Sequence, residues 1–353
     1  MRQPCTNCWC GRADNGSAES GPTCIHTNNI GDGPIEVAPM MFVSLHTHST
    51  FSYGDGYGPV GYHVDRVADL GMSSLALTEH GNCSSWVQLE KECKRRGIKP
   101  IFGIEAYVAP ENQPRKCHMI LLAGSQLGLR NLNAIITESW KTLGTTSKSK
   151  FPTVHIPVLR KYNRGLYALS GCSDGPISCL LLGGKFLGDK RMELSNTDFQ
   201  RARVGVERFQ AIFGERYFLE TQRFPGLERT CVLNPAFEKL SAATGARLVA
   251  TADVHYPYPN ENAMQRILHA AHRGGKSIET ADAEWEYDIL LTYPESDKQI
   301  YQDLVATGLS RKAAKAAIMA TKEIASYCNV ELPKAPPPKY IQGEKDWEPW
   351  VAN

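Results

Sequence analysis

The residues in this sequence that could do chemistry are histidines, carboxylates and a thiol, placed at or near the ends of short apolar runs. His46 and His48 end one such run, and Asp253 and His255 end another. Residues two apart on a strand share a face, so each pair can present two ligands to one pocket. Glu105 lies inside an apolar run, where burying an unpaired carboxylate is costly and a metal is a natural partner. The candidate metal ligands are His46, His48, Asp55, His80, Glu105, His118, Cys172, Asp253 and His255.

These side chains are typical of a centre that binds several divalent ions. Imidazole together with carboxylate suits Zn²⁺, Mn²⁺ or Fe²⁺, and a lone thiolate favours Zn²⁺ at one position. We therefore expect roughly two to three divalent ions as cofactors, Zn²⁺ or Mn²⁺ first and Mg²⁺ or Fe²⁺ as alternatives. Ions held close together can activate a water, polarise a phosphate and stabilise a leaving oxygen. The residues expected to take part in catalysis are His48, Glu105, Asp253 and His255.

Each of these residues also has a plain structural interpretation. A single histidine at a strand end is more often hydrogen-bonded than ligated, and a lone His-x-His occurs by chance in many proteins. Cys172, taken alone, is more typical of a buried small apolar side chain. What favours a metal centre is the joint placement, because the candidate ligands recur in step with the expected strands.

From Met41 onward, short β-rich runs alternate with amphipathic helical stretches, which is typical of an α/β fold. In an α/β barrel, ligand sites gather at the carboxyl ends of the strands because the loops there converge. The sequence therefore predicts a parallel sheet, closed into a distorted seven-stranded (β/α) barrel, with a helical carboxyl-terminal extension. The expected strands span 42–46, 74–78, 100–107, 118–123, 166–170, 216–220 and 247–252, and the expected helices span 60–70, 84–96, 126–140, 199–213, 230–244, 260–272, 296–306 and 310–327.

Composition divides the chain into three segments. Residues 1–38 are rich in Gly, Asn, Ser and Pro and show no helical or strand period, so we expect an appendage. Residues 39–330 form the main domain, and residues 331–353, which begin with the proline-rich run ELPKAPPPKY, form a linker and tail. The appendage has the ingredients of a small structural Zn²⁺ site, with a disordered cysteine-bearing tail as the alternative. Its candidate ligands are Cys5, Cys8, Cys10, Cys24 and His26.

The overall composition limits the choice of partners and compartment. The chain has 353 residues with 39 basic and 37 acidic side chains, so its net charge of +2 makes no strong case for nucleic acid. Any DNA contact must therefore be local. No apolar run reaches the ~18 residues of a membrane span, and the amino terminus lacks a secretory signal, so we expect no membrane partner. The 11 cysteines are then more typical of thiols or metal ligands in a reducing cytoplasm than of disulfides.

Several motifs of the sequence together resemble those of one known family. The motifs are LHTHSTFSYGDG (45–56), LALTEHGN (75–82), KPIFGIEAYVAP (99–110), HMILLAGSQLGLRNL (118–132), GLYALSGCSDGPIS (165–178) and LVATADVHY (248–256). They resemble the PHP domain (polymerase and histidinol phosphatase family) found at the amino terminus of bacterial DNA polymerase III alpha subunits. The resemblance covers about residues 41–335, in the order and spacing of the family. One departure is Glu79, where the family usually has Asp beside the histidine.

The resemblance implies a division of the ligands among three ions. His46, His48, Glu105 and Asp253 would surround the first ion. Glu105 would bridge to a second ion, held also by His118 and Cys172. The third ion would be held by Asp55, His80 and His255. Glu79 is not expected to be a ligand, but its extra methylene could shift His80 and so disturb the third ion.

The function implied by the resemblance is that of a metal-dependent phosphodiesterase. We expect a 3′–5′ exonuclease that removes nucleoside monophosphates from a single-stranded or mispaired DNA 3′ end during replication. One alternative is a small-molecule phosphatase of the same superfamily, for example one acting on histidinol phosphate. Another is a non-catalytic scaffold that recruits a polymerase.

A polymerase active site is not expected in this chain, because no Asp-x-Asp pair occurs in it. The resemblance instead suggests a separately encoded polymerase chain as a partner. The expected docking surface for it is the helix 310–327 with the proline segment 331–340.

Overall fold

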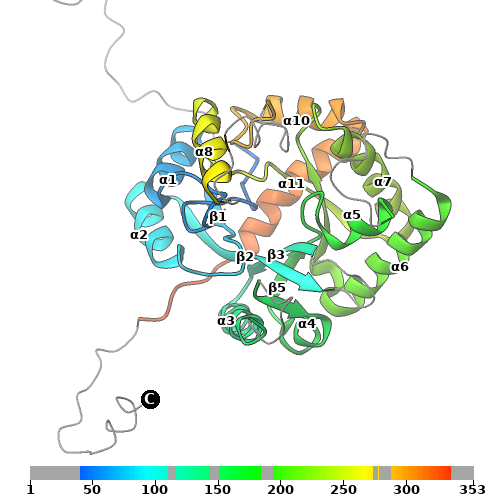
Figure 1. Ribbon diagram of the computed structural model, residues 1–353, viewed down its shortest axis with the longest axis horizontal. Helices are drawn as coiled ribbons and strands as arrows, with labels where there is room; N and C mark the ends of the chain where they lie inside the picture. Colours follow the sequence, from blue (N-terminus) through cyan, green and yellow to red (C-terminus); the bar gives the residue numbers. More distant parts are fainter. Residues whose placement is uncertain are drawn as a thin grey trace, which may run out of the picture. The chain divides into compact units, whose positions relative to one another are not determined.

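The computed structural model describes residues 40–109, 117–143, 151–183, 194–272, 277 and 288–334. Within them the chain forms an α/β domain whose strands make one curled sheet (Figure 1). Along the sheet the order is β1-β2-β3-β5-β6-β7, and β4 pairs with β2 off this path. The strands are β1 (Ser74–Leu77), β2 (Lys99–Ala109), β3 (Cys117–Ala123), β4 (Thr153–His155), β5 (Leu166–Leu169), β6 (Tyr217–Gln222) and β7 (Arg247–Thr251).

The sheet is mixed, so the expectation of a wholly parallel sheet is wrong. β3 runs antiparallel to both of its neighbours, β2 and β5, whereas β1–β2, β2–β4, β5–β6 and β6–β7 are parallel. Only residues 110–116 separate β2 from β3. A parallel crossover needs a dozen residues or more, so this short connection permits only an antiparallel pair.

The predicted strand 42–46 is also not a regular strand. Ser44 forms an isolated bridge with Leu75 in β1, and Thr47 forms one with Val254 just after β7. The amide of His48 donates to the Val254 carbonyl at 2.7 Å. The two edges of the curled sheet therefore meet through single bridges to residues 44–47, and this seam holds the His-x-His pair.

The predicted helices are present with shifts of a few residues at their ends. Serine side chains cap several of them, since Ser125, Ser195, Ser296 and Ser310 each accept a hydrogen bond from a first-turn amide. The short elements β4, α4 and α5 were not predicted, because runs of three to seven residues carry too little periodicity. The helices are α1 (Val60–Asp69), α2 (Trp86–Arg96), α3 (Gln126–Trp140), α4 (Ile156–Tyr162), α5 (Pro176–Leu181), α6 (Asn196–Phe213), α7 (Glu228–Thr244), α8 (Asn262–His272), α10 (Asp297–Ala306) and α11 (Arg311–Tyr327), with 3₁₀ turns η1 (Gly214–Arg216) and η2 (Pro259–Glu261).

Helix α11 is built into the core, which corrects its interpretation as an extension beyond the barrel. Its expected role in docking a partner stays a prediction. Its residues Ala320, Ile324 and Ala325 are buried in one cluster with Val43, Leu45 and residues of β1, β2, β3, β5, β6 and β7. Figure 1 shows α11 crossing the centre of the domain, beside the strands. The opposite faces of the strands pack on α1 to α7 in a second, larger cluster. Removing α11 would therefore unfold the sheet rather than only detach a partner.

Two further expectations concern the terminal segments and membrane-spanning helices. The candidate ligands Cys5, Cys8, Cys10, Cys24 and His26 and residues 335–353 of the tail lie outside the described residues. Among the residues that are described, a search for helices long and apolar enough to cross a bilayer finds none.

Two helical glycines give opposite predictions for the same substitution. A Cβ on Gly128 in α3 would lie 2.0 Å from the Gly165 carbonyl oxygen, whereas one on Gly61 in α1 would meet its nearest atom at 3.7 Å. We expect Gly128→Ala to lower the free energy of unfolding by about 1–3 kcal/mol through overpacking. Gly61→Ala should raise it by up to ~1 kcal/mol because alanine favours helix. Denaturant titration checks both; a stabilising Gly128→Ala would contradict the packing of α3 on the 163–166 turn.

Candidate metal centre

The predicted ligands converge at one end of the sheet, around a cavity of about 100 Å³. His46 and His48, from the seam, are fully buried behind its wall. The side chains that line the cavity are Asp55, His80, Glu105, His118, Cys172, Ser173, Asp174, Gln222, Phe224, Leu227, Arg229, Asp253, His255 and Leu291.

Glu105, in the middle of β2, is at the centre of the group and is only 1% exposed. Its Oε1 lies 3.3 Å from His46 Nε2 and 3.1 Å from His118 Nδ1. Its Oε2 lies 3.4 Å from His48 Nε2 and 2.8 Å from His80 Nδ1. Each oxygen thus faces two imidazoles, and the carboxylate links histidines from the seam, from the end of β1 and from β3.

Asp253 approaches the same histidines from the β7 side. Its Oδ1 lies 3.1 Å from His46 Nε2 and 3.7 Å from His48 Nε2, while its Oδ2 accepts a hydrogen bond from the Gln222 side chain at 2.9 Å. Asp253 has φ 42°, the one positive φ of a non-glycine residue in the described ranges. Such a backbone costs of order 1–3 kcal/mol and persists where the surroundings enforce it. Here the bridge of Thr47 to Val254 fixes the next residue.

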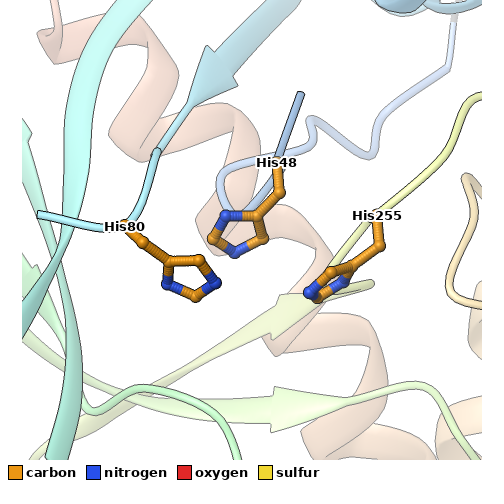
Figure 2. Close-up of side chains that lie close together, drawn as sticks. All are labelled: His48, His80 and His255. Carbon is orange, nitrogen blue, oxygen red and sulfur yellow. The ribbon is translucent and has the colours of Figure 1, made fainter. Parts of the chain in front are cut away.

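Asp55 lies in the loop after the seam and contacts the remaining histidines. Its Oδ2 lies 2.9 Å from His80 Nε2 and 3.2 Å from His255 Nε2. The ring of His48 is 4.3 Å from that of His80 and 4.6 Å from that of His255, so the three imidazoles surround one space (Figure 2). The predicted third group, Asp55, His80 and His255, is therefore close together in the structure.

Cys172 lies at the edge of the group. Its Sγ is 3.8 Å from His118 Nδ1, in the turn that follows β5. Burial and the nearby carboxylates of Asp253 and Glu105 hold the pKa of the Cys172 thiol well above its usual range. Without a cation beside it this thiol is therefore protonated at neutral pH.

The outward-facing ring nitrogens make hydrogen bonds that leave the inner nitrogens available. His46 Nδ1 donates to Glu220 Oε1 at 2.7 Å, and His255 Nδ1 donates to the carbonyl of Asp253 at 2.8 Å. These acceptors cannot donate, so a neutral imidazole in either position carries its lone pair on Nε2, toward the centre. Such outer acceptors are the usual partners of metal-binding histidines.

The electrostatics of the group are strongly coupled. Burial alone would raise the pKa of Glu105, but His118, His46 and His80 hold that pKa well below its usual range. Glu105 is therefore ionised at neutral pH. A buried anion surrounded by imidazoles attracts cations, either protons on the histidines or metal ions between them.

The pKa values of two histidines are shifted in opposite directions. Burial lowers the pKa of His255, but Asp55 and Asp253 more than offset this and raise it to about 9. Burial and the neighbouring His80 and His255 hold the pKa of His48 well below its usual value. His48 is thus neutral at pH 7, whereas His255 is protonated. An imidazole that can accept a proton therefore lies beside one that can donate a proton, with 4.6 Å between the ring centroids.

These residues fit a multi-ion metal site by a geometric test. Both oxygens of Glu105 and Nδ1 of His80 are buried without a hydrogen bond, although His80 Nδ1 is only 2.8 Å from Glu105 Oε2. The atoms approach without the angles of a hydrogen bond, as expected when they point toward a shared position between them. Sets of ligand atoms within 4.8 Å of one another are His48, His80 and His255; His46, His48 and Asp253; and His80, Glu105 and His118.

Several residues in this centre were not found by sequence reasoning. Glu220, in buried β6, carried the same signal as Glu105, an acid inside an apolar strand, and could have been found. Glu79 is fully buried, and its carboxylate accepts from Ser49 Oγ at 2.6 Å and Ser52 Oγ at 2.5 Å. Ser52 Oγ also lies 2.8 Å from His48 Nδ1, so Glu79 supports His48 through Ser52. His269 of α8, which contacts Asp55, gave no signal in the sequence.

Comparison with known proteins shows the family to which the sequence is related. The sequence profile of the PHP domain matches residues 44–224, just over half of the chain. DNA polymerase III subunit alpha of Treponema pallidum is 34% identical over 242 residues, which are 66% of this chain and 19% of that protein. The Bacillus subtilis subunit is 32% identical over 295 residues, or 83% of this chain and 23% of that protein.

Two further matches are more limited. An error-prone DNA polymerase of Symbiobacterium thermophilum is 33% identical over 245 residues, 65% of this chain and 20% of that protein. An amidohydrolase structure from Chromobacterium violaceum has a TM-score of 0.40 at 15% identity, covering 61% of this chain and 88% of that one. The chain thus spans about a fifth of the length of its sequence relatives. It belongs to the PHP domain family, and its relatives there include the alpha subunits of bacterial DNA polymerase III.

Proposed function

We propose that this domain is a metal-dependent phosphodiesterase that trims a DNA 3′ end, single-stranded or mispaired, in a 3′–5′ direction. The observation that carries the proposal is the buried Glu105 carboxylate, whose two oxygens face four imidazole nitrogens. A group of this kind is costly to bury unless cations share it.

The ligands would be divided as their positions suggest. His46, His48 and Asp253 would hold one ion with Glu105, and Glu105 would share a second with His118 and Cys172. Asp55, His80 and His255 would hold the third. The ions, when bound, would lower the pKa of water, neutralise the phosphate and stabilise the departing 3′ oxygen.

The cavity beside these ligands supports a nucleotide as substrate. Phe224, Leu227 and Leu291 form part of its lining, and Arg229 also borders it. An apolar wall suits a base or sugar face, and a guanidinium suits a phosphate. At about 100 Å³ the cavity is smaller than typical small-molecule pockets, so it would take only the end of a longer ligand.

The sequence relatives support a role in DNA replication. They are named as DNA polymerase III alpha subunits, so we propose that the domain acts beside a replicative polymerase. We keep the division into residues 1–38, 39–330 and 331–353, and a structural Zn²⁺ in the first of these, as further proposals. Domain truncation and zinc analysis of Cys5→Ser with Cys8→Ser test them.

Glu105 provides the test of metal binding. The protein should bind about two to three equivalents of transition metal per chain. Glu105→Gln should retain less than about one, because the neutral amide removes the ligand shared by two ions. Elemental analysis after dialysis measures this, with the exposed Glu207→Gln as control. Less than one equivalent in the unsubstituted protein would contradict the trinuclear proposal.

Metal binding should also depend on pH with a defined sign. His255 has its pKa raised to about 9, so it carries a proton at neutral pH that an ion must displace. The affinity for Mn²⁺ should therefore rise as pH increases toward about 9, and binding should release protons into a weakly buffered solution. Affinity that falls over the same range would contradict the assignment of His255.

Asp253→Asn separates chemistry from folding. Asparagine tolerates the left-handed backbone that Asp253 adopts, so the fold should persist. The Mn²⁺-supported release of monophosphates from a labelled 3′ end should fall at least ~10²-fold, because a ligand carboxylate is lost.

The readouts distinguish the alternatives. Circular dichroism controls for folding, and EDTA should abolish activity. Equal rates for both proteins would show a contaminating nuclease, and turnover of histidinol phosphate instead of DNA would show a phosphatase. No turnover by the metal-loaded protein would leave a scaffold.

A further inference from the structure

One contact in the metal centre comes from a helix far along the chain. His269 of α8 is 1% exposed, and its Nε2 lies 2.5 Å from Asp55 Oδ1. The other oxygen of Asp55 is the one near His80 and His255. The two carboxylate oxygens of Asp55 therefore make separate contacts. Oδ1 contacts α8, and Oδ2 contacts the other proposed ligands of the third ion.

Helix α8 holds the loop of Asp55 at a second point. His272, one turn after His269, packs its ring edge-on against Tyr53 at 5.1 Å. A Cβ on Gly54 would lie 2.3 Å from the His272 ring, so the loop backbone runs directly against this helix. Residues 53–55 are thus held by two histidines on one face of α8.

His80, His255 and Glu105 are held in a different way from Asp55. Glu105 is within β2, His80 follows β1 and forms a backbone bridge with Glu105, and His255 follows β7 with its amide bonded to the Leu291 carbonyl. Backbone contacts therefore hold all three. Asp55 comes from a loop and its side chain is 26% exposed. A loop carboxylate that is partly in solvent can rotate away from the centre unless another group holds it.

We propose that His269 is a positioning residue for the third ion: by holding Asp55 Oδ1 it keeps Oδ2 directed at His80 and His255. The inference rests on the proposed function, because it takes Asp55 as a metal ligand. It adds a residue 214 positions away that lies outside the segment matched by the family profile, which ends at residue 224. The occupancy of the third ion is thereby linked to the placement of α8.

The chain offers matched variants to test this. His269→Leu removes the contact, and His269→Gln keeps a donor close to the position of Nε2. His272→Leu on the same helix disturbs the packing on the loop but not the contact with Asp55. Binding of Mn²⁺ and of Zn²⁺ by each full-length variant is measured by competition with a chromogenic chelator and by elemental analysis.

We expect His269→Leu to weaken the last-bound ion by ~10–100-fold, the usual effect of losing a group that orients a ligand. The remaining ions should keep their affinities. His269→Gln and His272→Leu should stay within roughly 3-fold of the unsubstituted protein. In an Asp55→Asn background His269→Leu should add almost nothing, because the two changes act through one contact.

Melting temperatures of the metal-free proteins separate this role from a purely structural one. A positioning role leaves the metal-free melting temperature of His269→Leu close to that of His272→Leu. The inference is overturned if His269→Leu binds all ions normally, weakens all of them alike, or has its full effect in the Asp55→Asn background. A full loss in His269→Gln would instead make His269 a ligand itself. If the unsubstituted protein binds no metal, the proposed function fails first and this inference falls with it.

Discussion

The burial of one carboxylate sets the conditions for the rest of the structure. Glu105 is in β2, which pairs with β1, β3 and β4, and its side chain is almost completely buried. A buried anion of this kind must be compensated, and the compensation comes from His46, His80 and His118, on three separate segments. The curl of the sheet brings those segments within reach, so the fold and the electrostatics of the centre require each other.

The seam between the sheet edges has an irregular backbone that brings ligands toward Glu105. Residues 44–47 bridge β1 on one side and Val254 on the other, and Asp253 adopts a left-handed backbone beside them. A regular strand here would alternate its side chains strictly and leave Asp253 extended. The irregular backbone instead directs His46, His48 and Asp253 to one point. Irregularity at the site is offset by regular packing elsewhere, above all by α11 in the interior of the sheet.

The sequence alone predicted what depends on local pattern. Apolar runs located six of the strands. Glu105, inside one of those runs, and His118 and Cys172, at the ends of two others, do lie together. Strand direction at β3 was missed because it depends on connection length rather than on pattern, and β4 because three residues show no period. Glu79 is a departure from the family pattern, but its carboxylate accepts hydrogen bonds from Ser49 and Ser52, and Ser52 contacts His48. Contacts across 214 residues, such as His269 to Asp55, have no local signature at all.

The proposed ligands are held by different parts of the fold, some by strands and some by loops or helices. His46 is braced by Glu220, whose backbone lies within β6. His48 is braced by Ser52 and, through it, by Glu79 next to β1. Asp55 belongs to a loop, and its Oδ1 is held by His269 of α8, outside the sheet. Sites built on strands hold their geometry better than sites built on loops. The group around Asp55 is therefore expected to hold its geometry less firmly than the groups built on strands. Its members Asp55, His80 and His255 line the same cavity as Glu105, His118, Cys172 and Asp253, so a displacement of Asp55 changes the wall of the cavity that all of these side chains share.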